Sequence, residues 1–295
     1  MRRPIIVVFL SLFLMAVQAL AAERGALFKV TSKGNTLYLY GTIHAGKPEF
    51  YPLEPRIRAA MAAAPTLALE VDAARDPAAM MAAFQQHGMF PAGSPGIAAL
   101  PAERRQRIET GLRKQGIDPA AVAQMKPWMV ATILAVADLG KLGYNPALGV
   151  DAHLAHLARG GNTRIAELES AQYQAALMNR MSDGDQWRLL EEALENMESG
   201  RQLREAREMF DAYERADQAA LDGIARRLDS DTTLTGKFTR DVVLNERNGP
   251  MADKVASLLA SENNAVVAVG LLHLLGKNGL PELLRQRGIA VERLY

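Results

Sequence analysis

A four-residue pattern, Gly-x-x-His, occurs near both ends of the 295-residue chain and each time follows an apolar run. Gly41-Thr42-Ile43-His44 follows Leu37-Tyr38-Leu39-Tyr40, and Gly270-Leu271-Leu272-His273 follows Ala265-Val266-Val267-Ala268-Val269. Short apolar runs rich in β-branched or aromatic residues are typical of buried strands. Ligands bind at the carboxyl ends of strands in open α/β sheets. We therefore expect His44 and His273 to meet at the rim of one sheet.

The rest of the chain has strand patterns towards its ends and helical patterns in its middle. Further strands are predicted at residues 27–30, 66–71, 162–168 and 290–294, and helices at 54–63, 149–159, 173–181, 240–259 and 279–287. The pattern of residues 76–143 predicts helices with breaks at 91–96, at Gly116 and before Pro127. The charged stretch 183–228 predicts a pair of helices with a break near Ser199.

This order predicts an α/β fold: a central mixed β-sheet built from N- and C-terminal segments, with flanking helices and a large helical cap insertion. We expect a single domain over residues 22–295. Segments 22–75 and 240–295, with a strand and helix unit at 145–170, would form the sheet core. Segments 76–144 and 171–239 would form the cap.

Residues 1–21 have the pattern of a secretory signal peptide. Arg2 and Arg3 precede an almost wholly apolar stretch, and Ala19-Leu20-Ala21 is an A-x-A cleavage site. An uncleaved membrane anchor is the alternative. No later segment reaches the roughly 18 apolar residues that a transmembrane helix needs. We expect a periplasmic or secreted protein without stable membrane insertion after cleavage.

Composition excludes several classes of function. The chain has no cysteine, which rules out disulfides and thiolate chemistry. Arg2 and Arg3 are the only charges of the signal peptide, so its removal takes the formal net charge from +1 to −1. No basic block indicates a nucleic-acid partner. GxSxG, HExxH, GxGxxG and Walker patterns are missing from the sequence.

His44, Glu70 and His273 are the leading candidates for chemistry, because all three end apolar strand runs. Two imidazoles and a carboxylate make a common catalytic metal site with an open position for water. They equally make a metal-free acid/base group in which Glu70 orients a histidine. A histidine after a strand is also commonly a plain core or loop residue.

Four further residues are secondary candidates. Asp151 is a plausible helix N-cap. Glu169 ends another strand, where it would be a supporting acid of the site or contact the next helix N-terminus. Arg247 and Asn248 lie in the segment 245–252, which interrupts a helical run. They would hold a substrate oxyanion or orient Glu70, and a surface salt bridge is the alternative.

The remaining histidines and one aromatic residue have simpler interpretations. His153 and His156 are three residues apart on one face of a predicted helix, a spacing that can bind metal but lacks any accompanying motif. His87 precedes Gly88, as expected for a residue interacting with the dipole at a helix C-terminus. Trp128 follows Pro127 and is expected to be a buried aromatic at a helix start.

Seven segments in order resemble the TraB/PrgY/GumN family, which includes the Tiki proteins: LYLYGTIHAG, LALEVD, MKPWM, GVDAHL, IAELESAQYQ, LNERNGPMA and VAVGLLHLLGKNGLPELLRQRGIAVERL. The resemblance implies a fold similar to the erythromycin-esterase and ChaN-like group, a central sheet with flanking helices and a helical insertion. It also implies metal-dependent proteolysis with Mn or Co. His44, His273 and Glu70 match the family's two GxxH motifs and its acid, and Arg247 and Asn248 match its Arg-Asn motif.

The leading expectation is an exported hydrolase, a metal-dependent peptidase acting on a peptide or small-molecule substrate. His44, Glu70 and His273 would hold a divalent Mn, Co or Zn ion. Arg247 and Asn248 would stabilise the oxyanion, and Glu169 or Asp151 would shuttle the proton. The alternatives are a non-catalytic protein that binds a peptide or haem in the same cleft, and a metal-free esterase with a His44–Glu70 dyad.

Overall fold

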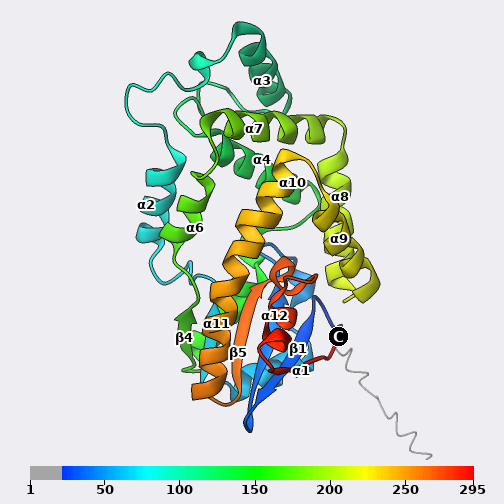
Figure 1. Ribbon diagram of the computed structural model, residues 1–295. Coiled ribbons are helices and arrows are strands. Elements are labelled where there is room, and N and C mark those ends of the chain that lie inside the picture. Colours follow the sequence, from blue (N-terminus) through cyan, green and yellow to red (C-terminus); the bar gives the residue numbers. More distant parts are fainter. Residues whose placement is uncertain (1–21) are drawn as a thin grey trace, which may run out of the picture.

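A six-stranded mixed sheet forms the base of the molecule in the computed structural model, which describes residues 22–295 (Figure 1). The predicted signal peptide lies outside the described residues. The strands are β1 (Leu27–Ser32), β2 (Asn35–Thr42), β3 (Thr66–Leu69), β4 (Arg164–Glu167), β5 (Ala265–Gly270) and β6 (Ala290–Arg293). Their order is β4-β3-β5-β2-β1-β6, with β4, β3, β5 and β2 parallel and β1 antiparallel to β2 and β6. The predicted α/β class is confirmed.

The register of the central strands brings three carboxyl ends together. On β5, Gly270 pairs with Thr42 of β2, and Ala268 pairs with Leu69 of β3. Because β5 lies between β2 and β3, the segments that follow these strands leave the sheet at one rim. All four residues of β3 and the first five of β5 are buried, as expected for parallel strands covered on both faces.

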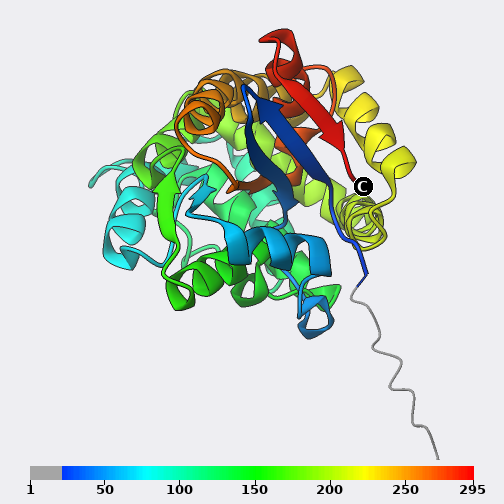
Figure 2. The same cartoon turned by 90° about the horizontal axis from the view of Figure 1, so that it is seen from below.

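Helices cover both faces of the sheet, giving three layers (Figure 2). One face carries α1 (Pro55–Ala63) and α5 (Val150–Gly160), and the other carries α11 (Glu246–Ser261) and α12 (Leu280–Gln286). Glu54 caps α1 by accepting from the N–H groups of Arg56 and Ile57. The apolar side chains between these layers form one contiguous core.

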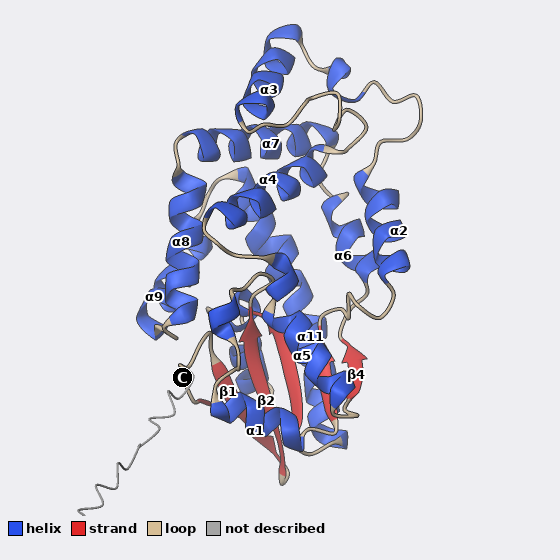
Figure 3. Ribbon diagram, turned by 180° about the vertical axis from the view of Figure 1, so that it is seen from behind, coloured by secondary structure: helices blue, strands red, loops and turns tan. Residues whose placement is uncertain are grey.

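The other helices extend beyond the carboxyl ends of the parallel strands (Figures 1 and 3). They are α2 (Pro77–Gly88), α3 (Ala102–Lys114), α4 (Pro127–Lys141), α6 (Ala171–Met178), α7 (Asp183–Glu198), α8 (Arg201–Glu214), α9 (Gln218–Ser230) and α10 (Leu234–Phe238). Trp128 is buried at the start of α4, as predicted. Two smaller apolar clusters hold α3, α4 and α7 together. The helical region stands over the rim as the sequence predicted.

Two local expectations are wrong. The stretch 183–228 forms three helices, because a second break follows α8, where Ala216 has a left-handed φ of 47° and Asp217 caps α9. The segment 245–252 does not interrupt its helix: a π-helical turn, η4 (Thr239–Asn245), leads directly into α11, which continues past Pro250. Pro250 is exposed, so it removes one hydrogen bond on the solvent side only.

Within residues 22–295, no helix combines the length and the apolar character needed to cross a membrane.

Candidate active site

A cavity of about 340 Å³ opens at the rim of the sheet, between the strand ends and the helix α2. Its polar wall includes His44, Glu70, Asp151 and Gln174. Met80 and Phe84 of α2 contribute to its apolar wall. We call this cavity the rim pocket.

Gly270 marks the point at which the three leading candidates converge. A Cβ atom built on Gly270 would lie 3.1 Å from Oε1 of Glu70, 3.6 Å from Nε2 of His44 and 3.7 Å from Cδ2 of His273. The structure therefore brings together side chains that are 26 to 229 positions apart in the sequence, and glycine leaves room between them.

His273 is buried beneath the rim pocket and its ring has a fixed orientation. Asn248 donates from Nδ2 to the carbonyl oxygen of Asn278 at 2.8 Å, which turns its Oδ1 towards Nδ1 of His273 at 2.6 Å. Nδ1 must therefore carry the proton, and Nε2 presents its lone pair 3.7 Å from Oε1 of Glu70. Burial lowers the pKa of His273 to about 4, so the ring is neutral at neutral pH.

Glu70 is a buried carboxylate held by several donors. Its Oε1 accepts from the N–H of Gly270 at 2.6 Å. Its Oε2 accepts from Arg247 at 2.5 Å and from Gln174 at 3.1 Å. Burial alone would raise its pKa, but at the acidic pH where Glu70 titrates the charges of protonated His273 and of Arg247, with the Gly270 N–H, outweigh burial and lower the pKa to about 2. Glu70 is therefore ionised throughout the physiological range.

Arg247 joins two acids at the base of the site. Its Nε lies 3.0 Å from both carboxylate oxygens of Glu169, and its Nη2 donates to Glu169 and Glu70 at 2.5 Å. Its Nη1 donates to the carbonyl oxygen of Val243 in η4. The side chain of Arg247 is 7% exposed, so the alternative of a surface salt bridge is wrong. Every nitrogen is engaged, which favours the role of orienting Glu70 over that of binding an oxyanion.

His44 has a different environment, because its side chain is 68% exposed. Its Nδ1 lies 3.3 Å from Oδ1 of Asp151, and this interaction raises the pKa of His44 to about 9. The partner of His44 is therefore Asp151, whereas the dyad expected from the sequence paired it with Glu70.

The predicted N-cap role of Asp151 is wrong, because Gly149 occupies the N-cap of α5 and Asp151 lies in the first turn. The N–H of Val150 donates to the carbonyl oxygen of Ile43 at 2.9 Å, which places the start of α5 against the His44 loop. A Cβ on Gly149 would lie 3.0 Å from the carbonyl oxygen of His44. This close approach brings the Asp151 carboxylate to the imidazole.

Gln174 is a site residue that the sequence did not single out. Its Nε2 donates to Glu70 at 3.1 Å and to Glu169 at 2.9 Å. It lies in the first turn of α6, whose N-cap Ser170 accepts from the Tyr173 N–H as predicted. A helix that starts at a strand end directs its first turn over the rim, and that position was the available signal. Thr42 lines the same pocket, and its Oγ1 has no partner among the described residues.

The other histidines lie outside the rim pocket. His153 stacks on Tyr51 with ring centroids 3.9 Å apart, and burial lowers its pKa. His156 is an exposed residue on the same helix. His87 is in the last turn of α2, as predicted, and links to α6 through Asn179 at 2.9 Å.

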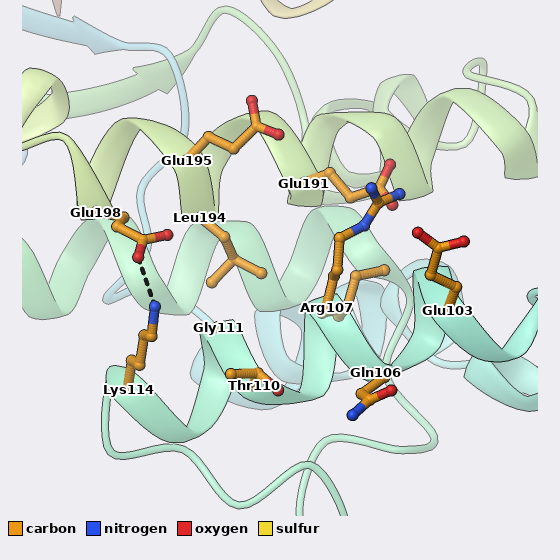
Figure 4. Close-up of a pocket in the computed structure, with 11 residues that line it drawn as sticks. Glu103, Gln106, Arg107, Thr110, Gly111, Lys114, Glu191, Leu194, Glu195 and Glu198 are labelled. Atoms are coloured by element: carbon orange, nitrogen blue, oxygen red, sulfur yellow. Dashed lines mark hydrogen bonds and ion pairs between the residues drawn. The ribbon is translucent and has the colours of Figure 1, made fainter.

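A second hollow, of about 490 Å³, lies between α3 and α7 (Figure 4). Its walls carry charged side chains that pair across the two helices, such as Lys114 with Glu198 at 2.5 Å. Glu191 of the lining also pairs with Arg104, which lies outside the lining, at 2.7 Å. These contacts are those of a solvated helix pair, so we place the candidate active site at the rim pocket.

The donor set at the rim pocket is chemically suited to a divalent ion. Nε2 of His273 is unprotonated, and an amide fixes its other nitrogen, an arrangement typical of metal-binding histidines. His44 has a carboxylate at its Nδ1 and its Nε2 near Gly270, and because its pKa is raised to about 9, Nε2 would have to release a proton to bind an ion. Across residues 22–295, however, no three His, Asp or Glu side chains already stand close enough together to hold a metal ion. Coordination would require a shift of these side chains.

Comparison with known proteins shows one family over nearly the whole chain. The sequence pattern of the TraB/PrgY/gumN family matches residues 26–293. The uncharacterized protein YbaP of Escherichia coli (strain K12) is 26% identical over 260 residues, which cover 87% of this chain and 90% of that protein. YbaP of Shigella flexneri matches with the same identity and coverage. No solved structure matches the chain.

Proposed function

Since the chain belongs to the TraB/PrgY/gumN family, we propose that it is an exported hydrolase that cleaves an amide or ester bond in the rim pocket with a divalent Mn, Co or Zn ion. The observation that carries the proposal is the convergence of Nε2 of His44, Nε2 of His273 and Oε1 of Glu70 around Gly270. Export is proposed from the signal-peptide pattern of residues 1–21.

His44, His273 and Glu70 would hold the ion. When bound, such an ion polarises a carbonyl and lowers the pKa of a water molecule from 15.7 to about 7. The protein's own groups prepare the site for this chemistry. Asn248 keeps Nε2 of His273 free of a proton, and Arg247 keeps Glu70 in place and ionised.

Asp151 and Thr42 are the groups left to act on a substrate. Asp151 orients His44 and lines the pocket, where its carboxylate can accept a proton from the attacking water. The hydroxyl of Thr42 can donate to a substrate oxygen. Arg247, Asn248 and Glu169 are positioning residues, because their polar groups bind other protein groups.

Hydrolysis by the mature chain, expressed without a histidine tag, tests the proposal. p-Nitrophenyl acetate and a fluorogenic peptide mixture serve as probes, before and after chelation and with metal restored. We expect chelator-sensitive hydrolysis that disappears in His273→Ala and Glu70→Gln. His156→Ala is the matched control, because His156 is an exposed histidine outside the pocket. Full activity in His273→Ala would reject the site.

A metal-free hydrolase is the second candidate, favoured by the exposure of His44 and its contact with Asp151. Both oxygens of Glu70 already accept hydrogen bonds, which also fits a site without an ion. In this reaction the neutral form of His44, which increases as the pH approaches its raised pKa of about 9, takes the proton from water while Asp151 orients the ring. Activity that resists chelation but is lost in Asp151→Asn would select this candidate over the metal-dependent one.

A further inference from the structure

We infer that an apolar groove between α2 and α4 binds the hydrocarbon chain of an acylated substrate, an inference that rests on the proposed function of the rim pocket. The groove is a hollow of about 890 Å³. Gln85 is the one polar side chain in its lining among the described residues. Five methionines also line it: Met80, Met81, Met89, Met125 and Met129.

The groove adjoins the rim pocket and shares a wall with it. Ala73, Met80 and Phe84 line both hollows. Met80 and Phe84 are four residues apart on α2, so they present one helix face to both. A ligand whose reacting group lies beside His44 and Glu70 can therefore extend over this shared wall into the groove.

The chemistry of the lining selects an acyl chain over a peptide. A peptide backbone brings donors and acceptors at every residue, and leaving them unpaired away from water is costly. The groove offers only Gln85 as a side-chain partner and carries no charged side chain in its lining. A hydrocarbon chain needs no partner and gains from each buried methylene.

The groove also shows apolar surface that nothing in the described chain covers. Met81 is 60% exposed and Ile133 is 38% exposed, and they are two of the few large hydrophobic side chains with such exposure. Methionine side chains are flexible and polarisable, so they adapt to chains of different shape. The wall that the groove shares with the rim pocket points to an occupant that is part of the substrate.

Binding of cis-parinaric acid, a fatty acid that fluoresces in apolar surroundings, tests the groove without requiring hydrolysis. We expect saturable binding to the mature chain and at least a fivefold higher dissociation constant in Met81→Gln and in Ile133→Gln. Leu157→Gln is the matched control, because Leu157 is 37% exposed on α5 and outside the groove. Thermal melts of all three variants verify that they fold.

Saturable binding that weakens in both groove variants but not in the control would support the inference. It would do so even if no ester were cleaved, in which case the hydrolase proposal alone would fail. Equal binding of cis-parinaric acid in wild type and the groove variants, or no binding, would overturn the inference about the groove. Displacement of the probe by an apolar peptide but not by dodecanoate would also overturn it.

A series of p-nitrophenyl esters gives the second readout. If the groove holds the acyl chain, kcat/KM rises from acetate through hexanoate to dodecanoate, and the rise is smaller in Met81→Gln than in Leu157→Gln. Hydrolysis that does not depend on acyl-chain length would overturn the inference that the groove binds the acyl chain, while leaving the hydrolase proposal intact.

Discussion

Nδ1 of His273 lies 2.6 Å from Oδ1 of Asn248, and this contact determines that Nε2 of the buried ring faces Glu70. Replacing Asn248 with alanine removes the acceptor and lets the ring take the other tautomer. Loss of such an orienting partner typically costs about 10- to 100-fold in metal affinity or activity. We expect a loss in that range, measured by metal titration and by hydrolysis of p-nitrophenyl acetate. Unchanged metal affinity in Asn248→Ala would contradict the orienting role.

Arg247→Met is expected to destabilise the fold severely. Arg247 separates the carboxylates of Glu70 and Glu169, and its removal leaves buried acids without a cation. Breaking a buried pair in this way costs about 3–5 kcal/mol. The free energy of unfolding in urea is the measurement.

Arg164→Met is the control for that loss, because Arg164 pairs with Glu262 at an exposed position. Exposed pairs contribute about 0–1 kcal/mol. If both variants lost the same free energy of unfolding, the ion pairs of Arg247 would contribute no more than an exposed surface pair.

Gly270→Ala is expected to reduce activity more than stability. The added methyl group would lie 3.1 Å from Oε1 of Glu70 and would fill the space between the candidate ligands. We predict at least about a tenfold loss of kcat/KM, equivalent to roughly 1.4 kcal/mol of transition-state stabilisation. Gly249→Ala on α11 is the control, since a Cβ there meets nothing within 4 Å. A fully active Gly270→Ala enzyme would argue against a site in which His44, Glu70 and His273 converge at Gly270.

The pH dependence of stability should report on Glu214. Burial alone would raise its pKa, but hydrogen bonds from Tyr144 and Lys47 outweigh burial and lower it. A carboxyl whose folded pKa is lowered stabilises the protein above its unfolded pKa, and this contribution is lost as the pH falls through the folded pKa. Glu214→Gln should therefore cost about 1 kcal/mol at neutral pH.

Below the folded pKa of Glu214, wild type and Glu214→Gln should have the same stability, because the carboxyl is then protonated. Urea unfolding of both proteins at neutral and acidic pH gives the comparison. A stability difference that does not depend on pH would assign the effect to packing rather than to charge.

The strand ends could be predicted from sequence because their pattern is local. Apolar runs before His44, Glu70 and His273 indicate buried strands, and the parallel pairing of β3, β5 and β2 then places all three residues at one rim. The strand runs also predicted the mixed sheet, since β1 and β2 form a hairpin.

The partners of these residues could not be predicted, because they depend on packing between distant segments. Asp151 reaches His44 only because the start of α5 bonds to Ile43. The sequence predicts that Arg247 holds an oxyanion or orients Glu70, but its second partner, Glu169, follows only from the entry of α11 from η4, which buries Arg247 between two acids. For Gln174 the sequence offers only its position in a helix that starts at a strand end, and the docking of α6 over the rim is what shows its role.

The metal content of the untagged protein, expressed without residues 1–21, tests the central claim most directly. The account predicts about one equivalent of Mn, Co or Zn per chain in wild type and its loss in both His44→Ala and His273→Ala, while His156→Ala retains it. The same metal content in wild type and in both pocket variants would show that these two histidines do not share a metal site.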